Sequence, residues 1–485
     1  MTTGESRLAV FYAAAGVDTG WGHVVRCGAL ASALVDCGWR VAFLCRTEMK
    51  GPVRAYIPES AEILSETDIE PGAVSARFWD RWPGGCDLLV MDDYALDETF
   101  EPSFRPWARR SLVMEDIPSR HLAGDLVLDP TPGRTRADYD ERLPANCGFI
   151  GGSQYALLRS PFSRVIRKPL DPPKVLVAFG ATDPGNHTAA VISALNGMSL
   201  EIVLGGMAPH LDDVRRLVAA QRPEAQLHVD IGAEDLATLL GGCTLAVGAG
   251  GSGAWERCAG GLPSVVFEVA DNQQSVVRSL IASGAAILGA ADLRLAVEAV
   301  LADQAALDTM SRAARRLCDG FGAIRLARML TGIETRKGDH VTLRPASPED
   351  SALMFDWQVQ PETRRFAKQP VAPSWKEHGA WFSRRMANPD SLLYMIERVD
   401  GPSGVLRLDR EEDDAWLVSI YIAPDSYGRG IASAALALVH SIWPRQEFRA
   451  EVLEGNAISH KLFVGAGYGK KNGLYRYHAR EPADA

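Results

Sequence analysis

One histidine stands out by its place in the chain, because His23 ends the glycine-rich segment GVDTGWGH, residues 16–23. Gly16, Gly20 and Gly22 allow a sharp bend between the apolar run before them and the helical pattern after them. Histidine suits general-base chemistry near neutral pH, and backbone N–H groups at a helix start favour an anion. The loop therefore predicts a base beside an anionic ligand. A histidine that caps the helix or packs in the core is the alternative.

Three carboxylates are expected near this histidine. Asp18 belongs to the same loop, and Asp92 and Asp93 end a buried apolar run within residues 86–94. The carboxyl ends of neighbouring parallel strands meet at one edge of a sheet, where such sheets bind ligands. We expect Asp92 or Asp93 to orient His23 or to contact the ligand. Capping of the strand end is the alternative.

A second glycine-rich turn occupies residues 244–258, TLAVGAGGSGAWERC. Its glycines let a diphosphate approach the backbone, and Glu256 lies one turn into the next helix, where a carboxylate can accept hydrogen bonds from ribose hydroxyls. The amides of Asn272 and Gln273 can contact a sugar. The glycine spacing also fits a dinucleotide fingerprint with Glu268 as the ribose contact, so a nicotinamide cofactor is an alternative.

A third turn, YGRGIA at residues 427–432, stands between a strand-like run and an amphipathic helical pattern. Gly428, Arg429 and Gly430 expose backbone N–H groups at the start of that helix. Such a turn is a second place in the chain at which phosphate groups can bind.

The elements that position these residues form a repeated pattern. Residues 7–15 are typical of a buried strand, residues 24–38 of a helix closed by Gly38, and residues 40–46 of the next strand. This βαβ order predicts a parallel sheet, and strand-helix alternation begins again with the strand 174–180. The sequence therefore predicts an α/β chain with two Rossmann-like doubly wound domains, followed by an α+β domain.

Changes in composition set the expected domain boundaries. Residues 1–158 and 159–334 are the two Rossmann-like domains, joined by a polar, proline-bearing stretch that starts at Arg159. Residues 335–340, TRKGDH, are predicted to be a charged linker without core residues. Residues 341–485 are the expected α+β domain.

Composition excludes several classes of function. The chain has 485 residues and a formal net charge of −10, which disfavours nucleic acid as a partner. No apolar run is long enough to span a membrane, so no membrane partner is expected. The eight cysteines form no CxxC pair and no zinc pattern, which predicts free, buried thiols, no metal and a cytoplasmic location. The oligomeric state remains open.

Residues 7–330 resemble a known family through motifs in one order: GWGHVVRCGALASAL, MDDYALDETF, EDIPSRHLAGDLVLDP, YALLRSPF, VAFGATDPGNHT, GAGGSGAWE and DNQ. The resemblance is to the UDP-sugar hydrolases of the pseudaminic-acid pathway, the PseG family, which are similar to MurG-type glycosyltransferases of the GT-B fold. It implies hydrolysis of UDP-2,4-diacetamido-2,4,6-trideoxy-β-L-altropyranose with His23 as the catalytic histidine. The substrate-binding residues expected on this basis are Gly20, Gly22, Gly180, Gly250, Gly251, Ser252, Glu256, Asn272 and Gln273.

This chain departs from that family at one point. The family usually has an Arg-Ala-Asp-like triplet before the glycine loop, where this chain has Tyr12, Ala13 and Ala14. A carboxylate is thereby missing, and Asp18 is the predicted substitute.

Residues 341–480 resemble the GNAT acetyltransferases through IYIAPDSYGRGIASAALALVHSIW and FRAEVLEGNAISHKLFVGAGY. The resemblance implies acetyl-CoA as co-substrate. The residues expected to bind it are Ile420, Ile422, Gly428, Arg429, Gly430, Ala432, Asn456 and Ser459. Many relatives carry a tyrosine that protonates the leaving thiolate where this chain has Phe463, so the general acid is open among Tyr468, His460 and Glu454.

Together these resemblances predict a bifunctional enzyme of nonulosonic acid biosynthesis. One region N-acetylates the 4-amino group of a UDP-amino-sugar, and the other releases UDP from the product by inverting C–O cleavage. A MurG-like glycosyltransferase fused to an acetyltransferase, and a non-catalytic nucleotide-sugar sensor, are the alternatives. The expected catalytic residues are His23, Asp18, Asp92 and Tyr468.

Overall fold

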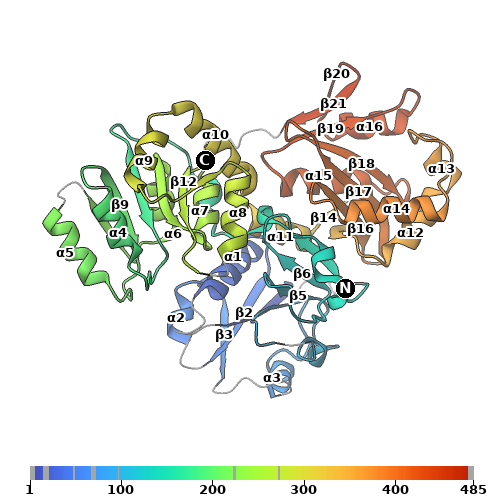
Figure 1. Cartoon of the computed structure of the whole chain (residues 1–485). Coiled ribbons are helices and arrows are strands. Elements are labelled where there is room, and N and C mark those ends of the chain that lie inside the picture. The colour runs from blue at the N-terminus through green and yellow to red at the C-terminus, as the bar shows by residue number, and fades with distance from the viewer. Residues whose placement is uncertain are drawn as a thin grey trace. The chain divides into compact units, whose positions relative to one another are not determined.

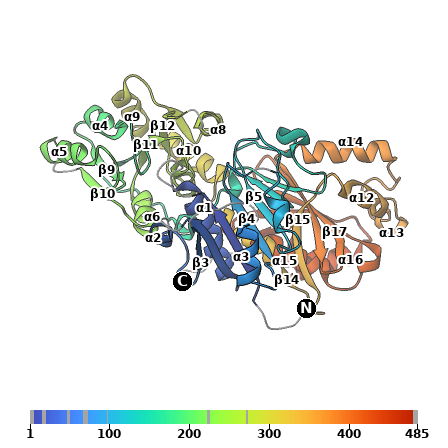
Figure 2. The same cartoon turned by 90° about the horizontal axis from the view of Figure 1, so that it is seen from below.

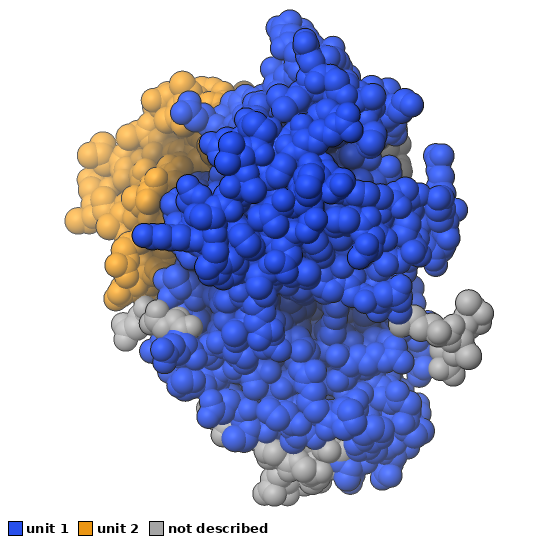
Figure 3. Space-filling view, turned by 90° about the vertical axis from the view of Figure 1, so that its right-hand side faces the viewer, with its two compact units in different colours: residues 1–129, 133–152, 324–485 blue, residues 130–132, 153–323 orange. Residues whose placement is uncertain are grey.

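The computed structural model describes residues 6–14, 21–46, 50–66, 73–96, 98–221, 225–270 and 273–478. The chain divides into two compact units, which Figure 3 colours separately. Residues 1–129, 133–152 and 324–485 form the first unit, and residues 130–132 and 153–323 form the second. In the described part of the chain, the first unit holds two sheets and the second holds one (Figure 1).

The N-terminal sheet has seven parallel strands. They are β1 Leu8–Ala13, β2 Arg40–Arg46, β3 Glu62–Glu66, β4 Leu88–Asp92, β5 Ser111–Met114, β6 Leu126–Asp129 and β7 Gly148–Gly151, with helices α1 Gly22–Asp36, α2 Lys50–Arg54 and α3 Ala73–Arg81. The order is β3-β2-β1-β4-β5-β6-β7. Every residue of β1 is buried, as the unbroken apolar run LAVFYA requires. The order reverses between β1 and β4, and a ligand site is expected at that switch point.

The second unit repeats this arrangement with six parallel strands. They are β8 Lys174–Ala178, β9 Ser199–Leu204, β10 Gln226–Val229, β11 Leu245–Ala249, β12 Ser264–Phe267 and β13 Ala286–Leu288; the helices are α4 His187–Ala194, α5 Leu211–Gln221, α6 Ala233–Gly242, α7 Gly253–Ala259, α8 Gln274–Ala282, α9 Leu293–Leu301 and α10 Gln304–Leu317. The order is β10-β9-β8-β11-β12-β13, with the switch point between β8 and β11. Val175 and Val177 pack into one apolar core and Leu176 into another, so helices cover both faces of the sheet.

The C-terminal sheet is mixed and has eight strands. They are β14 Ile333–Glu334, β15 His340–Pro345, β16 Ser391–Arg398, β17 Gly401–Arg410, β18 Trp416–Ile422, β19 Glu447–Glu451, β20 Gly469–Lys471 and β21 Leu474–His478; the helices are α11 Gly322–Thr331, α12 Asp350–Gln358, α13 Pro361–Arg364, α14 Trp375–Met386, α15 Ile431–Ile442 and α16 Ala457–Gly465. Neighbouring strands are antiparallel except β18 and β19, which are parallel. Helices α12 and α14 lie on one face of this sheet, and α15 and α16 lie on the other (Figure 2).

The predicted fold class is confirmed: two parallel doubly wound sheets precede an α+β region. Gly38 takes the left-handed conformation expected after α1, with φ of 83°, and its N–H donates to the carbonyl of Val35. The expected polar connector that begins at Arg159 instead contributes to the core of the second unit, because Phe162 and Val165 are buried there. The compact units change at 152/153 and 323/324, whereas the sequence places boundaries at 158/159 and 334/335.

The structure corrects the expectation that residues 335–340 are a linker between domains. Residues 335–339 form the turn between β14 and the antiparallel β15, which begins at His340, and Thr335 is buried. Asp339 forms ion pairs with Arg398 and Arg429. The charges of this segment are therefore used in fixed contacts, which charge-rich composition alone did not reveal.

The chain shows eight free cysteines, of which seven are buried and Cys37 is half-buried, so the predicted free thiols are confirmed. No helix within the described ranges is both long and apolar enough to cross a membrane. In the same residues, His, Cys, Asp and Glu side chains form no cluster that could hold a metal ion.

Candidate functional site

The switch point of the N-terminal sheet brings His23 and Asp92 together. His23 is the second residue of α1, and Asp92 is the last residue of β4. The His23 Nδ1 atom lies 2.6 Å from Asp92 Oδ1, and both side chains are buried. Asp93 instead accepts a hydrogen bond from the N–H of Ala95, which caps the turn after the strand. Asp92 is therefore the carboxylate that contacts the histidine.

A cation holds Asp92 in its ionised form. Arg26 lies one helical turn after His23, and its Nε and Nη2 atoms donate to Asp92 at 2.6 and 2.5 Å. Burial alone raises the pKa of a carboxyl group, but the charge and hydrogen bonds of Arg26, with the hydrogen bond from His23, lower the pKa of Asp92 to about 2. Asp92 thus stays anionic at neutral pH and fixes the orientation of the imidazole.

Sequence reasoning did not single out Arg26, Asp116 and Tyr94, which complete this cluster. Arg26 also pairs with Asp116 at 3.1 Å, and the hydroxyl of Tyr94 donates to Asp116. The Tyr94 ring meets the His23 ring edge-on, with centroids 4.9 Å apart. The spacing of three residues from His23 to Arg26 within one helix was the available signal, because such residues share a helix face.

The departure from the family triplet lies directly beside this cluster. Ala13 is in register with Asp92, and the N–H of Ala14 donates to the Asp92 carbonyl oxygen. Tyr12 is buried against Phe100, and burial raises its pKa to about 12. A carboxylate side chain at position 14 would start from backbone that is hydrogen-bonded to Asp92 of β4.

Three predicted site residues lie outside the described residues: Asp18, Gly20 and Asn272. The roles predicted for them, including the substitution by Asp18, remain predictions. Gly22 begins α1 and has open space around its Cα, since a Cβ there would meet nothing within 4 Å.

The second glycine turn lies at the switch point of the second unit. Gly180 follows β8 with φ of 100°, a conformation that L side chains rarely adopt, and Gly250 and Gly251 follow β11. A Cβ on Gly250 would lie 2.3 Å from Val277, and one on Gly251 would lie 3.4 Å from the Gln273 amide nitrogen. Gln273 is thus packed against the turn.

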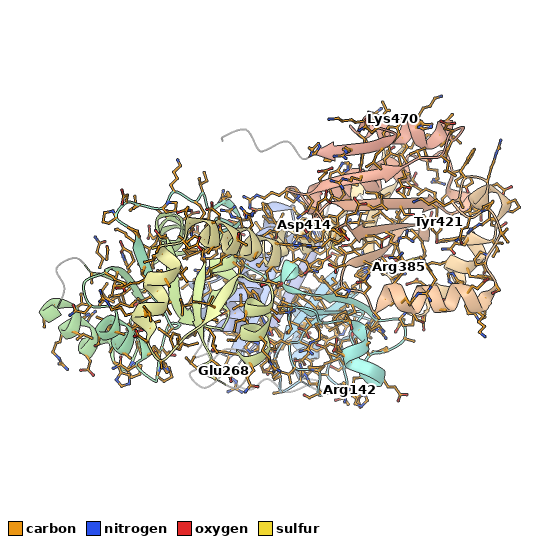
Figure 4. The ribbon with its side chains drawn as sticks, turned by 45° about the horizontal axis from the view of Figure 1, so that its top comes forward. Arg142, Glu268, Arg385, Asp414, Tyr421 and Lys470 are labelled. Atoms are coloured by element: carbon orange, nitrogen blue, oxygen red, sulfur yellow. The ribbon has the colours of Figure 1, made fainter. Side chains whose placement is uncertain are left out.

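Ser252 of the glycine turn is exposed, and Glu256 of the following helix α7 is half-buried. Glu256 in α7 pairs with Arg159 at 3.3 Å, and burial raises the pKa of its carboxyl group while Arg159 opposes that change. The carboxylate is therefore held in place by a cation from the same unit. Glu268, labelled in Figure 4, is exposed after β12.

Strand packing explains the glycine at position 248 without a dinucleotide ligand. It lies within β11 in register with Ala178 of β8, where a Cβ would come within 2.1 Å of the Ala178 carbonyl oxygen. Close strand packing therefore accounts for the first glycine of that pattern.

The third glycine turn opens α15. Gly428 and Gly430 have φ of 72° and 83°, and a Cβ on Gly428 would meet nothing within 4 Å. Ala432 lies in the first turn of the helix. The turn thus leaves backbone N–H groups with room for a ligand, which fits the diphosphate of acetyl-CoA.

The strand before this turn has an open edge. β17 pairs with β18 along its length, but β19 pairs only with Trp416 and Leu417 at the start of β18. The two parallel strands therefore diverge at Ile420 and Ile422. The main-chain groups on that edge can form hydrogen bonds with the amide groups of a pantetheine arm, as extended strands do with a bound peptide.

Two predicted binding residues lie at the start of α16. The Asn456 side-chain oxygen accepts a hydrogen bond from the Ser459 N–H at 3.1 Å, so this oxygen caps the helix. The Asn456 amide group and the Ser459 hydroxyl are the parts left to contact a ligand.

The structure distinguishes the candidates for the general acid. Tyr468 is buried among aromatic rings, with its hydroxyl 3.0 Å from His440 Nε2, and burial raises its pKa. His460 lies partly exposed on α16, with Nδ1 2.8 Å from the Tyr475 hydroxyl, and Glu454 is exposed. An acid must reach the leaving sulfur, which favours His460 or Glu454 by access.

Tyr421 is a further polar group near the open strand edge. It lies on β18 (Figure 4), and its ring meets Trp357 of α12. Burial raises the pKa of its hydroxyl, so it is a neutral donor. Residue patterns did not indicate this position, because it reads as an ordinary strand aromatic.

The comparisons with known proteins give one match to the C-terminal region and others that cover most of the chain. The family model for the acetyltransferase (GNAT) domain matches residues 340–468. The spore coat polysaccharide biosynthesis protein SpsG of Bacillus subtilis is 25% identical over 351 residues, which are 66% of this chain and 96% of the relative. An uncharacterized protein of Methanocaldococcus jannaschii is 22% identical over 411 residues, 79% of this chain and 81% of the relative.

Two solved structures complete the comparison. MurG of Acinetobacter baumannii covers 67% of this chain and 99% of its own, at 16% identity and a TM-score of 0.47. The spermidine N-acetyltransferase of Vibrio cholerae, in complex with CoA and spermine, covers 28% and 92%, at 17% identity and a TM-score of 0.25.

The C-terminal region is therefore a GNAT acetyltransferase domain. The N-terminal region resembles SpsG-like proteins, and its two parallel sheets have a Rossmann-like arrangement. The chain thus joins an SpsG-like region to an acetyltransferase domain.

Proposed function

We propose that the chain is a bifunctional enzyme that N-acetylates the 4-amino group of a UDP-amino-sugar and then hydrolyses the diacetamido product to free sugar and UDP. The proposed hydrolase substrate is UDP-2,4-diacetamido-2,4,6-trideoxy-β-L-altropyranose. The observation that carries the hydrolase is the contact of 2.6 Å between His23 and an ionised Asp92 at a sheet switch point.

In this proposal each nitrogen of His23 has its own role. Asp92 occupies Nδ1, so the imidazole donates its proton there and Nε2 is the acceptor for a proton from water. Arg26 keeps Asp92 charged and thereby keeps this tautomer. The base then activates water for attack at the anomeric carbon, on the face opposite to UDP, which inverts that centre.

The leaving group needs little help from an acid. A diphosphate held by backbone N–H groups is stabilised as it departs. We assign Gly250, Gly251, Ser252 and Gln273 to that contact, with Glu256 on the ribose. A glycosidase with two catalytic carboxylates is thus not required.

The acetyltransferase site has its own binding surface. The edge of β18 from Ile420 and the turn at Gly428 and Gly430 hold acetyl-CoA, which supplies the acetyl group as a thioester. The turn fixes the diphosphate, and the strand edge orients the thioester carbonyl toward the attacking amine. His460 and Glu454 are the accessible groups for proton transfer.

Hydrolysis in heavy-oxygen water tests the hydrolase. Attack at the anomeric carbon places the label in the sugar and none in UDP. His23→Asn should lower UDP release by about 10²–10⁴-fold, the usual contribution of a general base. Binding of UDP should change little, because the proposed contacts to UDP lie on the second glycine turn. His121→Asn, at an exposed histidine of the same unit, is the control and should retain full activity.

Other outcomes of these experiments would contradict the proposed hydrolase. Label in UDP means that water attacks phosphorus, and loss of UDP affinity in His23→Asn makes His23 a binding residue. UDP release that starts only after an acceptor is added indicates a glycosyltransferase, and no release at all indicates a sensor.

A further inference from the structure

The turn between β14 and β15 lies against the glycine turn of the acetyltransferase domain. Lys337 donates from Nζ to the Gly428 carbonyl oxygen over 2.7 Å. A Cβ built on Gly430 would lie 3.7 Å from the Cβ of Thr335. The segment that composition marks as a linker therefore borders the backbone groups assigned to the diphosphate.

Ion pairs and hydrogen bonds hold this segment in one conformation. Asp339 accepts from Nη2 and Nε of Arg429 at 2.6 and 3.1 Å, and from Arg398 at 3.0 Å. Within the turn, the Thr335 hydroxyl oxygen accepts the N–H groups of Lys337 and Asp339. Arg429 thus anchors the turn, and its charge is already neutralised by a carboxylate.

Lys337 is in a different electrostatic state. Its side chain is exposed, and across the described residues no carboxylate forms an ion pair with it. A chain with a net charge of −10 needs local cations to hold a multiply charged anion. Lys337 is a cation of this kind, within hydrogen-bond reach of the diphosphate turn.

We propose that Lys337 is a diphosphate-binding residue of the acetyl-CoA site and that Asp339 positions it through Arg429. The proposal rests on the acetyltransferase function proposed above. Lys337 forms a charge-assisted hydrogen bond to a phosphate oxygen, while Arg429 serves the turn and not the ligand. The connector from α11 is then part of the acetyl-CoA site.

Calorimetric titration of the full-length protein with CoA tests this assignment without an acceptor substrate. Lys337→Gln should weaken CoA binding by about 5- to 20-fold, as expected for a lost charge-assisted hydrogen bond at an exposed site. Lys337→Arg should stay within about 3-fold of the wild type, because it keeps the charge. Lys376→Gln, at an exposed lysine of α14, is the matched control and should bind CoA normally.

Two truncated ligands show which part of CoA Lys337 contacts. Pantetheine lacks the diphosphate, so Lys337→Gln and the wild type should bind it equally. Dephospho-CoA keeps the diphosphate and lacks only the 3′-phosphate, so the loss should persist with it.

Three results overturn the assignment. Equal CoA affinities of Lys337→Gln and the wild type remove Lys337 from the site. An equal loss for pantetheine shows a distorted turn in place of a lost contact. A loss that disappears with dephospho-CoA assigns Lys337 to the 3′-phosphate. A wild type that does not bind CoA is a separate result, which contradicts the acetyltransferase function itself.

Discussion

Asp92 carries a full negative charge without solvent contact, and this has a consequence for stability at low pH. Its side chain has 0% exposure, and its pKa falls from the usual 3.8 to about 2. A carboxyl group whose pKa is lower in the folded state stabilises that state above the unfolded pKa. The stabilisation is lost as the pH falls through the folded pKa, here between roughly pH 4 and pH 2.

The comparison of the wild type with Asp92→Asn measures this contribution. The shift corresponds to about 2 kcal/mol of unfolding free energy at pH 7 and about half of that at pH 3. The difference in unfolding free energy between the two proteins should therefore shrink by about 1 kcal/mol over that range. Urea unfolding followed by tryptophan fluorescence gives the values. A difference that does not change with pH means that folding does not lower the pKa of Asp92.

At the residue scale, the sequence predicts the histidine better than its partners. His23 is marked by the glycines before it, and Asp92 by its position after an apolar strand. Neither pattern decides between Asp92 and Asp93, because a shift of one residue reverses the direction of a strand side chain. The spacing from His23 places Arg26 on the same helix face, but its role depends on Asp92, a carboxylate far away in the sequence.

At the scale of elements, the glycine turn before α15 provides a direct test of the acetyltransferase site. Gly430→Asp places a side chain at a left-handed position, with φ of 83°, and brings a negative charge to the diphosphate. Acetyl transfer should fall by at least about 100-fold, while UDP release stays within about 2-fold. Both are measured on the same preparation, as CoA thiol and as UDP.

The matched control for this variant is Gly473→Asp. Gly473 has φ of 81° in the turn between β20 and β21, so this variant has the same strain and charge away from the acetyl-CoA site. Full acetyl transfer is expected from it. Loss of both activities in a folded Gly430→Asp protein would argue that the two sites depend on each other.

Sequence patterns predict the long apolar strands of both parallel sheets and miss the shorter ones. β1 is an unbroken apolar run and β8 is apolar after its first residue, whereas β13 has three residues and β3 carries glutamates at both ends. Such edge strands are defined by the neighbour with which they pair, which no local pattern records. The same reason explains why the turn after β14 was expected to be a linker.

At the scale of the whole molecule, the acetyltransferase domain belongs to the same compact unit as the N-terminal sheet. The Arg325 guanidinium of α11 lies 3.7 Å from the Trp443 ring centroid, and its Nε donates to the Ile442 carbonyl. Both side chains are almost fully buried. Removing the acetyltransferase domain therefore exposes a buried cation and leaves α11 without its packing partner.

A chain that ends at Thr335 should consequently be less stable than the full chain. We expect its first thermal transition to fall by several degrees and its binding of a hydrophobic dye to rise, because exposed apolar surface replaces a packed one. Arg325→Ala in the full chain is the control, since it removes this contact and keeps the domain. A truncated chain with an unchanged first transition and normal hydrolysis would show that the regions are independent.

The division of the chain into units also sets an order for its synthesis. Arg7 and Trp39 of the first unit bind the carbonyl and hydroxyl oxygens of Thr331, which emerges from the ribosome after the whole second unit. Residues 153–323 form a continuous stretch with their own cores, so they can fold as soon as they are made. The segment that is translated first is thus completed last, because the partners of Arg7 and Trp39 in α11 are made only after the second unit.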